Sequence, residues 1–280
     1  MNFKKRIDFK KATIILLVCP FSVLALINAK GIKQDIQTVS ASAMPMADKV
    51  IVHSDLSLLD EDTVSGHQKK SGGWEILFDG KNTDKWRSLK ADSFPTYAWA
   101  VEYGALSVKN HAKGEDIITK EEYDDFDLRF DFKLTVGANS GIKYFVEKVK
   151  ENVSGTVLWN GPEYQIIDDF NHPEVKDNKF PAASTASFYL VYAPENKKLF
   201  PPGEWNTGRI LAKGKHVEHW LNGIKVVSCE RGSPDFRNRI STTKFKNYDN
   251  YGELPSGHIM LTDHDGDQVY FRNIKIKRLK

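Results

Sequence analysis

Apolar and polar residues alternate with a period of two along most of the chain after residue 72, which is the pattern of strands that bury one face. The clearest case is segment 126–134, where every even position is apolar and every odd position is charged. The apolar set consists of Phe126, Leu128, Phe130, Phe132 and Leu134. We expect these five side chains to face the core between two sheets.

Turn and strand signals later in the chain indicate an antiparallel arrangement. Residues 217–227 predict a β-hairpin around Asn222-Gly223, because these residue types adopt the positive φ angles of a type I′ turn. A closing strand is expected over 269–279, with a β-bulge near Asn273, where the alternation slips. No segment predicts a long helix, so the pattern favours an all-β, two-sheet antiparallel sandwich.

Residues 1–29 have the features of a secretory signal peptide. A basic start precedes the apolar run 12–27, and Ala29 is a small residue at which cleavage would expose Lys30. The run of about 16 residues is short for a retained membrane span, and the residues around Cys19 match a lipid-attachment motif poorly. We therefore expect an exported protein, periplasmic or extracellular, with no stable membrane span after cleavage.

Residues 30–71 are polar and aperiodic, which predicts a linker or N-terminal extension before a single domain over 72–280. Removing 1–29 takes away five basic residues and one acid, so the formal charge falls from +3 to −1. The mature chain then has no basic stripe, and we expect no nucleic-acid partner. Cys229 would be its one cysteine, which excludes an internal disulfide.

The first candidate for chemistry is the segment from Glu163 to Asp168. Glu163 and Gln165 share one strand face, while Asp168 can join them only where the strand ends and the chain turns. With His172 close behind, this group suits acid–base chemistry, recognition of sugar hydroxyls or a hard metal ion. An exposed strand and loop is the alternative interpretation.

Two further segments place polar residues where a plain sandwich does not need them. Asn139 and Lys143 lie in a Gly- and Asn-rich turn and the strand after it, either at the rim of a cleft or as a tight turn with a solvated lysine. His264 lies in the acidic loop 263–267, which resembles a calcium loop only loosely. It is either a surface histidine or a base or ligand beside a second carboxylate cluster.

Six blocks of the domain, in the same order, resemble the 3-keto-disaccharide hydrolase family. They are Gly73–Asn82, Asn139–Ile142, Glu163–Asp168, Glu204–Thr207, His219–Gly223 and Phe271–Ile274. The resemblance implies a concanavalin-A-like jelly roll and a substrate class of glycosides oxidised to a ketone at C3. The family often has arginine on the strand after Asn-Ser-Gly, where this chain has Lys143, so a planar two-pronged donor is missing there.

The resemblance implies a hydrolase or eliminating enzyme that acts on a small-molecule carbohydrate, a 3-keto-glycoside or 3-keto-disaccharide. Glu163 and His264 are the acid–base candidates, and Asp168 would orient one of them or bind a metal. A divalent metal ion is the one cofactor considered. The residues expected to contact sugar hydroxyls or the ketone are Gln165, Asn139 and Lys143.

Two other functions fit the same sequence. A non-catalytic carbohydrate-binding module would use an aromatic platform, with Trp159 or Trp99 as candidates, and a structural or partner-binding domain would be attached through 30–71. Convergence of the candidate carboxylates with the histidine would favour the enzyme. In the block that begins at Glu204, we expect Trp205 to cap one end of the core and Asn206 to satisfy loop backbone groups.

Overall fold

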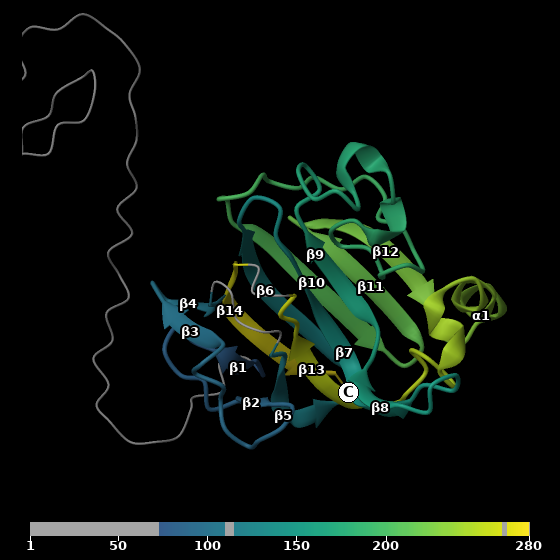
Figure 1. Cartoon of the computed structure of the whole chain (residues 1–280), viewed down its shortest axis with the longest axis horizontal. Coiled ribbons are helices and arrows are strands. Elements are labelled where there is room, and N and C mark those ends of the chain that lie inside the picture. The colour runs from purple at the N-terminus through teal and green to yellow at the C-terminus, as the bar shows by residue number, and fades with distance from the viewer. Residues whose placement is uncertain (1–72, 110–114, 265–267, 280) are drawn as a thin grey trace, which may run out of the picture. The chain divides into compact units, whose positions relative to one another are not determined.

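Two antiparallel β-sheets stack on each other in the described part of the chain (Figure 1). This computed structural model describes residues 73–109, 115–264 and 268–279. The predicted signal peptide (1–29), the linker (30–71) and residues 265–267 of the acidic loop lie outside the described residues. The two-sheet antiparallel sandwich predicted from the period-two pattern is confirmed.

The larger sheet is formed by eight described strands. They are β1 (Glu75–Phe78), β3 (Trp99–Glu102), β4 (Ala105–Val108), β6 (Phe126–Leu134), β10 (Asn206–Lys213), β11 (His216–Leu221), β12 (Ile224–Glu230) and β14 (Val269–Arg278). Their order is β12-β11-β10-β6-β14-β4-β3, with β1 also paired to β14. Strands β6 and β14 therefore lie at the centre, where both of their edges are paired.

The smaller sheet is formed by six described strands. They are β2 (Trp86–Ser88), β5 (Ile117–Tyr123), β7 (Asn139–Lys150), β8 (Val157–Asn160), β9 (Glu163–Ile167) and β13 (Gly257–Leu261). The order is β2-β5-β13-β7-β8, and β9 pairs with the first half of β7. The first half of the long strand β7 thus pairs with β9, and its second half pairs with β8.

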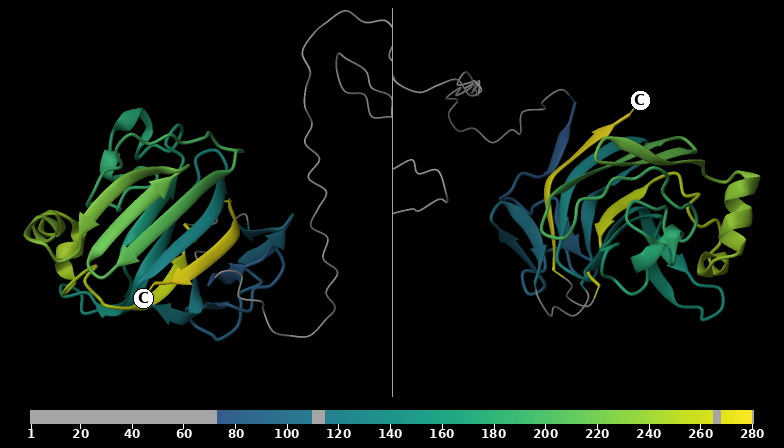
Figure 2. Two further views of the ribbon diagram at one scale, coloured as in Figure 1. Left: turned by 180° about the vertical axis from the view of Figure 1, so that it is seen from behind. Right: turned by 90° about the horizontal axis from the view of Figure 1, so that it is seen from above.

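The described helices are short and lie outside the two layers. They are α1 (Pro234–Ser241) and the 3₁₀ helices η1 (Lys176–Asn178), η2 (Pro181–Ala183) and η3 (Lys244–Asn247). Helix α1 lies at the edge of the sandwich opposite β3 and β4 (Figures 1 and 2). Within the described ranges, no helix combines the length and apolar character needed to cross a bilayer.

The core between the sheets contains the apolar face of β6, as predicted. All five of its alternating apolar side chains are buried. The Phe130 ring meets Tyr164 of β9 edge-on, with ring centroids 5.3 Å apart, so the two sheets contact directly at this point. Nearby, Tyr144 of β7 donates a hydrogen bond to His219 Nε2 of β11 at 3.0 Å.

The predicted turn and bulge also occur. Asn222 and Gly223 join β11 to β12 with φ angles of 49° and 80°, as a type I′ turn requires. In β14 the pairing with β6 slips between Arg272 and Lys275, and Asn273 has a φ angle of 54°. The side-chain alternation therefore changes at the position where the sequence pattern slips.

A row of cross-strand partners runs over the outer face of the smaller sheet. Arg87, Ile118, Met260, Lys143 and Glu163 are successive partners on β2, β5, β13, β7 and β9. Apolar members of this row form a small cluster that is separate from the main core. The row thus ends, on β7 and β9, in two charged side chains from predicted site segments.

Candidate active site

Glu163 and Gln165 lie on the face of β9 that points away from the core. Their neighbours Tyr164 and Ile166 belong to the main hydrophobic core, so the predicted alternation of this strand is confirmed. Glu163 is nevertheless only 5% exposed. Its Oε1 atom is buried and has no hydrogen-bond partner among the described residues. A buried acceptor left in this state is costly in a purely structural role and marks a position that a ligand can satisfy.

Gly141 on β7 makes room for the Glu163 carboxyl group. It is the cross-strand partner of Gln165, two pairs along from the Lys143–Glu163 pair. A Cβ atom at position 141 would collide with Oε1 of Glu163. The glycine in the Asn-Ser-Gly block therefore has a specific function here, because it lets the carboxyl group lie flat across β7.

The electrostatics around Glu163 favour a proton-exchanging carboxyl group. Burial, the largest cause, raises its pKa, while the positive charges of Lys143, His264 and Lys244 lower it in part. A carboxyl group whose pKa is moved toward neutrality can both donate and accept a proton under physiological conditions. Such a shift at a cavity wall is a recognised sign of a functional site.

Glu163 lines a cavity of about 280 Å³ that is closed on one side by η3. Lys143 and Asn160 contribute from β7 and β8, and Lys244 and Phe245 contribute from η3. Aromatic, amide and charged groups on one wall suit a polar ligand with an apolar face, and a pyranose is such a ligand. The volume is sufficient for one sugar ring rather than a long oligosaccharide.

The η3 segment is held rigidly over the sheet. Phe245 stacks on Tyr251 with ring centroids 4.0 Å apart, and Tyr251 donates a hydrogen bond to Gly161 O at 2.9 Å. Thr243 caps η3 by accepting a hydrogen bond from the backbone N–H of Phe245. These contacts tie the wall that carries Phe245 to the residue that lies two positions before Glu163.

Asp116 is a site residue that the sequence pattern did not indicate. It immediately precedes β5, and its Oδ1 accepts a hydrogen bond from the backbone N–H of Asp263 at 2.9 Å. Burial raises the pKa of its carboxyl group, and the charges of Lys143 and His264 lower it in part. The charge of Asp116 in turn raises the pKa of Glu163, so the two carboxyl groups share one electrostatic neighbourhood.

The three predicted sugar-contacting residues gather on the same face. Gln165 Nε2 donates a hydrogen bond to Asn139 Oδ1 at 3.0 Å, which fixes both amide groups beside Gly141. Lys143 is the cross-strand partner of Glu163. The structure thus brings together side chains from β7 and β9 that lie far apart in the sequence. Their part in substrate binding remains a prediction.

Asp168 was expected to orient Glu163 or His264 or to bind a metal, but its hydrogen bonds go to two loops. It lies just past the end of β9, fully buried, and accepts hydrogen bonds from the backbone N–H groups of Gly137, Phe170 and Asn171 and from the Asn171 side chain. These four bonds occupy both carboxylate oxygens and join two loops. Within the described part of the chain, no contact links the Asp168 carboxylate to Glu163 or His264, and its hydrogen bonds give it a loop-organising role.

His264 is exposed and does not line the cavity, although its charge acts on both Glu163 and Asp116. It therefore lies in their electrostatic neighbourhood but outside the cavity lining. The acidic loop continues from it into residues that are not described. Its assignment as the second acid–base group stays a prediction.

The tryptophans do not form an open aromatic platform. Trp99 is buried in the core and donates a hydrogen bond to Glu115 O at 2.6 Å. Trp159 is half-buried, with Arg87 and Lys148 over its ring. Neither residue presents the bare ring that a sugar would stack on, which weighs against the binding-module alternative.

The prediction for Trp205 is wrong, and the prediction for Asn206 is confirmed. Trp205 is half-buried, has the cationic groups of Lys133 and Arg272 over its ring and is not part of the core, so it does not cap the core. Asn206 does satisfy loop backbone groups, because it accepts from Phe200 N at 2.9 Å and donates to Phe200 O at 3.2 Å.

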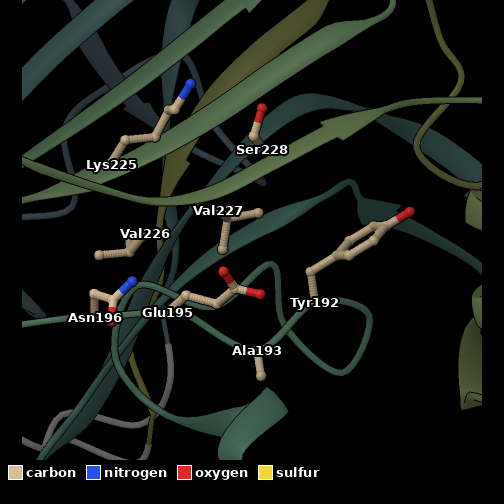
Figure 3. A pocket seen from close by; sticks show the side chains of 8 residues that line it. All are labelled: Tyr192, Ala193, Glu195, Asn196, Lys225, Val226, Val227 and Ser228. Atoms are coloured by element: carbon tan, nitrogen blue, oxygen red, sulfur yellow. The ribbon is translucent and has the colours of Figure 1, made fainter.

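A second cavity, of about 200 Å³, lies against the edge strand β12 (Figure 3). Glu195 and Lys225 are its charged lining residues, and the strand contributes Val226 and Val227. None of the predicted site residues lines it. We place the candidate active site at Glu163, since a raised carboxyl pKa and a second acidic group occur together there.

Comparison with known proteins agrees with the earlier resemblance. Residues 73–277 match the family described as the 3-keto-alpha-glucoside-1,2-lyase-like domain. The chain is 30% identical over 233 residues to a Bacteroides thetaiotaomicron protein named 3-keto-disaccharide hydrolase, in an alignment covering 74% of this chain and 79% of that protein.

Two solved structures from Parabacteroides distasonis, both put forward as glycosyl hydrolases, are also similar. One is 34% identical with a TM-score of 0.63 and covers 79% of this chain and 100% of its own. The other is 32% identical with a TM-score of 0.56 and covers 74% and 99%. The chain is thus of the β-sandwich hydrolase class with a glycosidase-like function. It belongs to the 3-keto-alpha-glucoside-1,2-lyase-like family.

Proposed function

We propose that the protein cleaves the glycosidic bond of 3-keto-glycosides, with Glu163 exchanging protons with the substrate. The observation that carries this proposal is the Glu163 carboxyl group: buried, raised in pKa, without a partner for Oε1, and lining a cavity of single-sugar size. The name of the Bacteroides thetaiotaomicron relative, a 3-keto-disaccharide hydrolase, supports the substrate class.

The chemistry follows from the ketone. A carbonyl group at C3 acidifies the proton on C2, so a positioned base can remove it. The resulting enediolate expels the group at C1: the C1–O bond breaks, a C1–C2 double bond forms, and the leaving oxygen takes a proton from an acid. Water then adds across the double bond, returning a proton to C2 and a hydroxyl group to C1, and the sum of the steps is hydrolysis.

The described side chains supply the groups that this route needs. Glu163 and His264 are proposed as the acid–base groups, and Asp116 raises the pKa of Glu163. Lys143 offers a positive charge to the enediolate oxygens, where charge develops in the transition state. Gln165, paired with Asn139, would bind sugar hydroxyls.

The test is product analysis with a 3-keto-disaccharide in D₂O, with and without a chelator. Elimination followed by hydration places solvent deuterium at C2, whereas direct displacement at C1 leaves the original C2 proton in place. The chelator arm shows whether a divalent ion takes part. No release of the keto sugar by the wild-type protein, with binding retained, would favour the binding-module alternative.

The role of Glu163 is tested by Glu163→Gln, which keeps the shape of the side chain and removes its proton exchange. We expect turnover to fall by roughly 10²-fold or more without unfolding. Glu195→Gln is the matched control, because Glu195 lines the other cavity (Figure 3). Equal turnover in the two variants would remove Glu163 from the mechanism.

We also propose that the protein works outside the cytoplasm. The basic start and apolar run of residues 1–29 support this proposal, and the soluble sugar substrate is compatible with it.

A further inference from the structure

Three side chains that could bind a metal meet on the smaller sheet, apart from the candidate active site. Glu122, Glu147 and His258 come from β5, β7 and β13, which are adjacent strands. One possible ligand atom from each lies within 4.8 Å of the others. No other such group of three occurs among the described residues, and Asp168 is not part of this one.

His258 has the geometry of a metal-binding histidine. Its side chain is only 9% exposed, and its Nδ1 lies 3.3 Å from the backbone oxygen of Glu121. Its Nε2 faces Glu122 Oε1 at 3.9 Å, which is beyond hydrogen-bond distance. Metal-binding histidines commonly use one nitrogen for a backbone carbonyl, which fixes the ring and the tautomer, and present the other nitrogen to the metal.

Neighbouring groups hold two of the three side chains in this arrangement. The Trp159 ring meets the His258 ring at 73°, with centroids 5.6 Å apart, and restricts its rotation. Ser256 Oγ donates a hydrogen bond to Glu122 Oε2 at 3.3 Å, which leaves Oε1 directed toward His258. The buried imidazole is thus fixed, while the exposed Glu122 carboxylate can adjust by a small rotation.

We propose that Glu122, Glu147 and His258 bind one divalent transition-metal ion of the zinc type. An imidazole nitrogen with two carboxylate oxygens is a donor set that zinc accepts, whereas calcium and magnesium prefer oxygen ligands alone. Zinc–ligand bonds of about 2.0–2.2 Å place the ligand atoms of a tetrahedral site roughly 3.3–3.6 Å apart, so the three side chains would have to close by up to about 1 Å. Water would complete the coordination.

The proposed ion is separate from the Glu163 site. His258 is two residues from Met260 on β13, and Met260 is linked to Glu163 through Lys143 on β7. Two strand spacings and two residues along a strand separate the backbones of His258 and Glu163 by about 12 Å. The ion would therefore tie three neighbouring strands together and stabilise the sheet, and the proposal does not rest on the proposed reaction.

The experiment is calorimetric titration of the full-length, untagged, chelator-treated protein with zinc chloride, and with calcium and magnesium chloride for comparison. We expect one equivalent of zinc to bind and to raise the melting temperature. His258→Gln and Glu122→Gln should each weaken binding by about 10-fold or more. The matched control is Glu121→Gln, whose carboxylate pairs with Arg278 instead and should leave zinc affinity unchanged.

The Glu163→Gln variant distinguishes zinc binding at this site from binding in the candidate active site. We expect it to bind zinc with the affinity of the wild type. Loss of zinc binding in that variant, with retention in His258→Gln, would assign the ion to the Glu163 cavity and overturn the proposal. Absence of zinc binding by the wild type, or preference for calcium, would overturn it as well. Because Glu122 is exposed, Glu122→Gln keeps the test valid even if His258→Gln fails to fold.

Discussion

At the scale of single residues, His219 shows how burial changes a titratable side chain. It is fully buried and stacks against Phe188. Its Nδ1 donates a hydrogen bond to Ala186 O at 3.1 Å, and Tyr144 donates one to its Nε2 at 3.0 Å. Burial, the largest cause, lowers its pKa to about 4. The ring is therefore neutral at pH 7 and acts as a hydrogen-bonded link between the sheets.

This pKa predicts a pH-dependent loss of stability. The unfolded chain, with an ordinary histidine pKa of about 6.5, binds the proton more readily than the folded protein between pH 6.5 and about 4. The contribution of the neutral, buried His219 ring to the free energy of unfolding is thus fully present above pH 6.5. It is lost as the pH falls from 6.5 to about 4. A shift of this size corresponds to about 3 kcal/mol in the free energy of unfolding.

Urea unfolding of the wild type and of a Tyr144→Phe/His219→Phe double variant, from pH 7.5 to pH 4, measures this contribution. The double variant loses the Ala186 hydrogen bond at every pH, so it should be less stable throughout but show a flatter pH dependence over this range. Parallel curves for the two proteins would show that His219 does not titrate as stated.

Gly141 gives a second prediction at this scale. In Gly141→Ala, the new Cβ atom would meet Oε1 of Glu163, the free end of a flexible side chain, so the carboxyl group should move while the fold persists. We expect turnover of the 3-keto-disaccharide to fall by roughly 10²-fold, as for loss of the acid–base group, with little change in melting temperature.

Gly257→Ala is the contrasting variant. A Cβ atom there meets backbone atoms of Phe145 and Val146, which cannot move aside, so stability should fall instead. A normal turnover rate in Gly141→Ala would mean that the placement of the Glu163 carboxyl group is unimportant for the reaction.

The candidate site was predictable from the sequence only where its residues share one segment. Glu163 and Gln165 follow from strand alternation, because neighbours two apart point to one face. Asp116 does not, since its contact with Asp263 spans 147 residues and depends on the pairing of β5 with β13. The partners of Asp168 depend on loop geometry, which alternation does not describe.

At the scale of elements, β6 was the best predicted, because its alternation is unbroken and both of its edges are paired. Strand β7 is different: Phe145 has a φ angle of 51°, and the pairing with β13 slips next to it. Tyr144 and Phe145 consequently both pack in the main core. Simple alternation therefore holds only for the first half of this strand.

The packing of β6 predicts a large loss of stability in Phe130→Ala. The Phe130 ring contacts Phe132 and Tyr164, and its removal leaves a cavity that fixed strands cannot fill. We expect the free energy of unfolding to fall by roughly 3–5 kcal/mol. Val136→Ala, at an exposed position, is the control and should change it by less than about 0.5 kcal/mol. Similar denaturation midpoints would contradict the core assignment.

At the scale of the whole molecule, the two-sheet architecture was predictable, but the segments and side chains packed around the sheets were not. Period-two strands and one hairpin suffice to indicate a sandwich, since each strand must bury its apolar face. The wall formed by η3 depends on Phe245, Tyr251 and Gly161, which are brought together only by the finished fold. The prediction for Trp205 was wrong for a related reason: a large aromatic residue was expected in the core, but its contacts with Lys133 and Arg272 depend on the finished fold.

The last prediction concerns the first part of the chain, for which the amino-acid pattern is the only guide. The pattern predicts export with cleavage before Lys30. It combines a basic start, an apolar run shorter than a typical transmembrane helix and a small residue at position 29. Cleavage would change the formal charge from +3 to −1 and turn a basic chain into a slightly acidic one. Intact mass measurement of the protein from its native host, with the periplasmic and cytoplasmic fractions separated, should find a product that begins near Lys30 outside the cytoplasm. A product that retains Met1 and stays in the cytoplasmic fraction would refute export, and an added lipid mass at Cys19 would show anchoring instead.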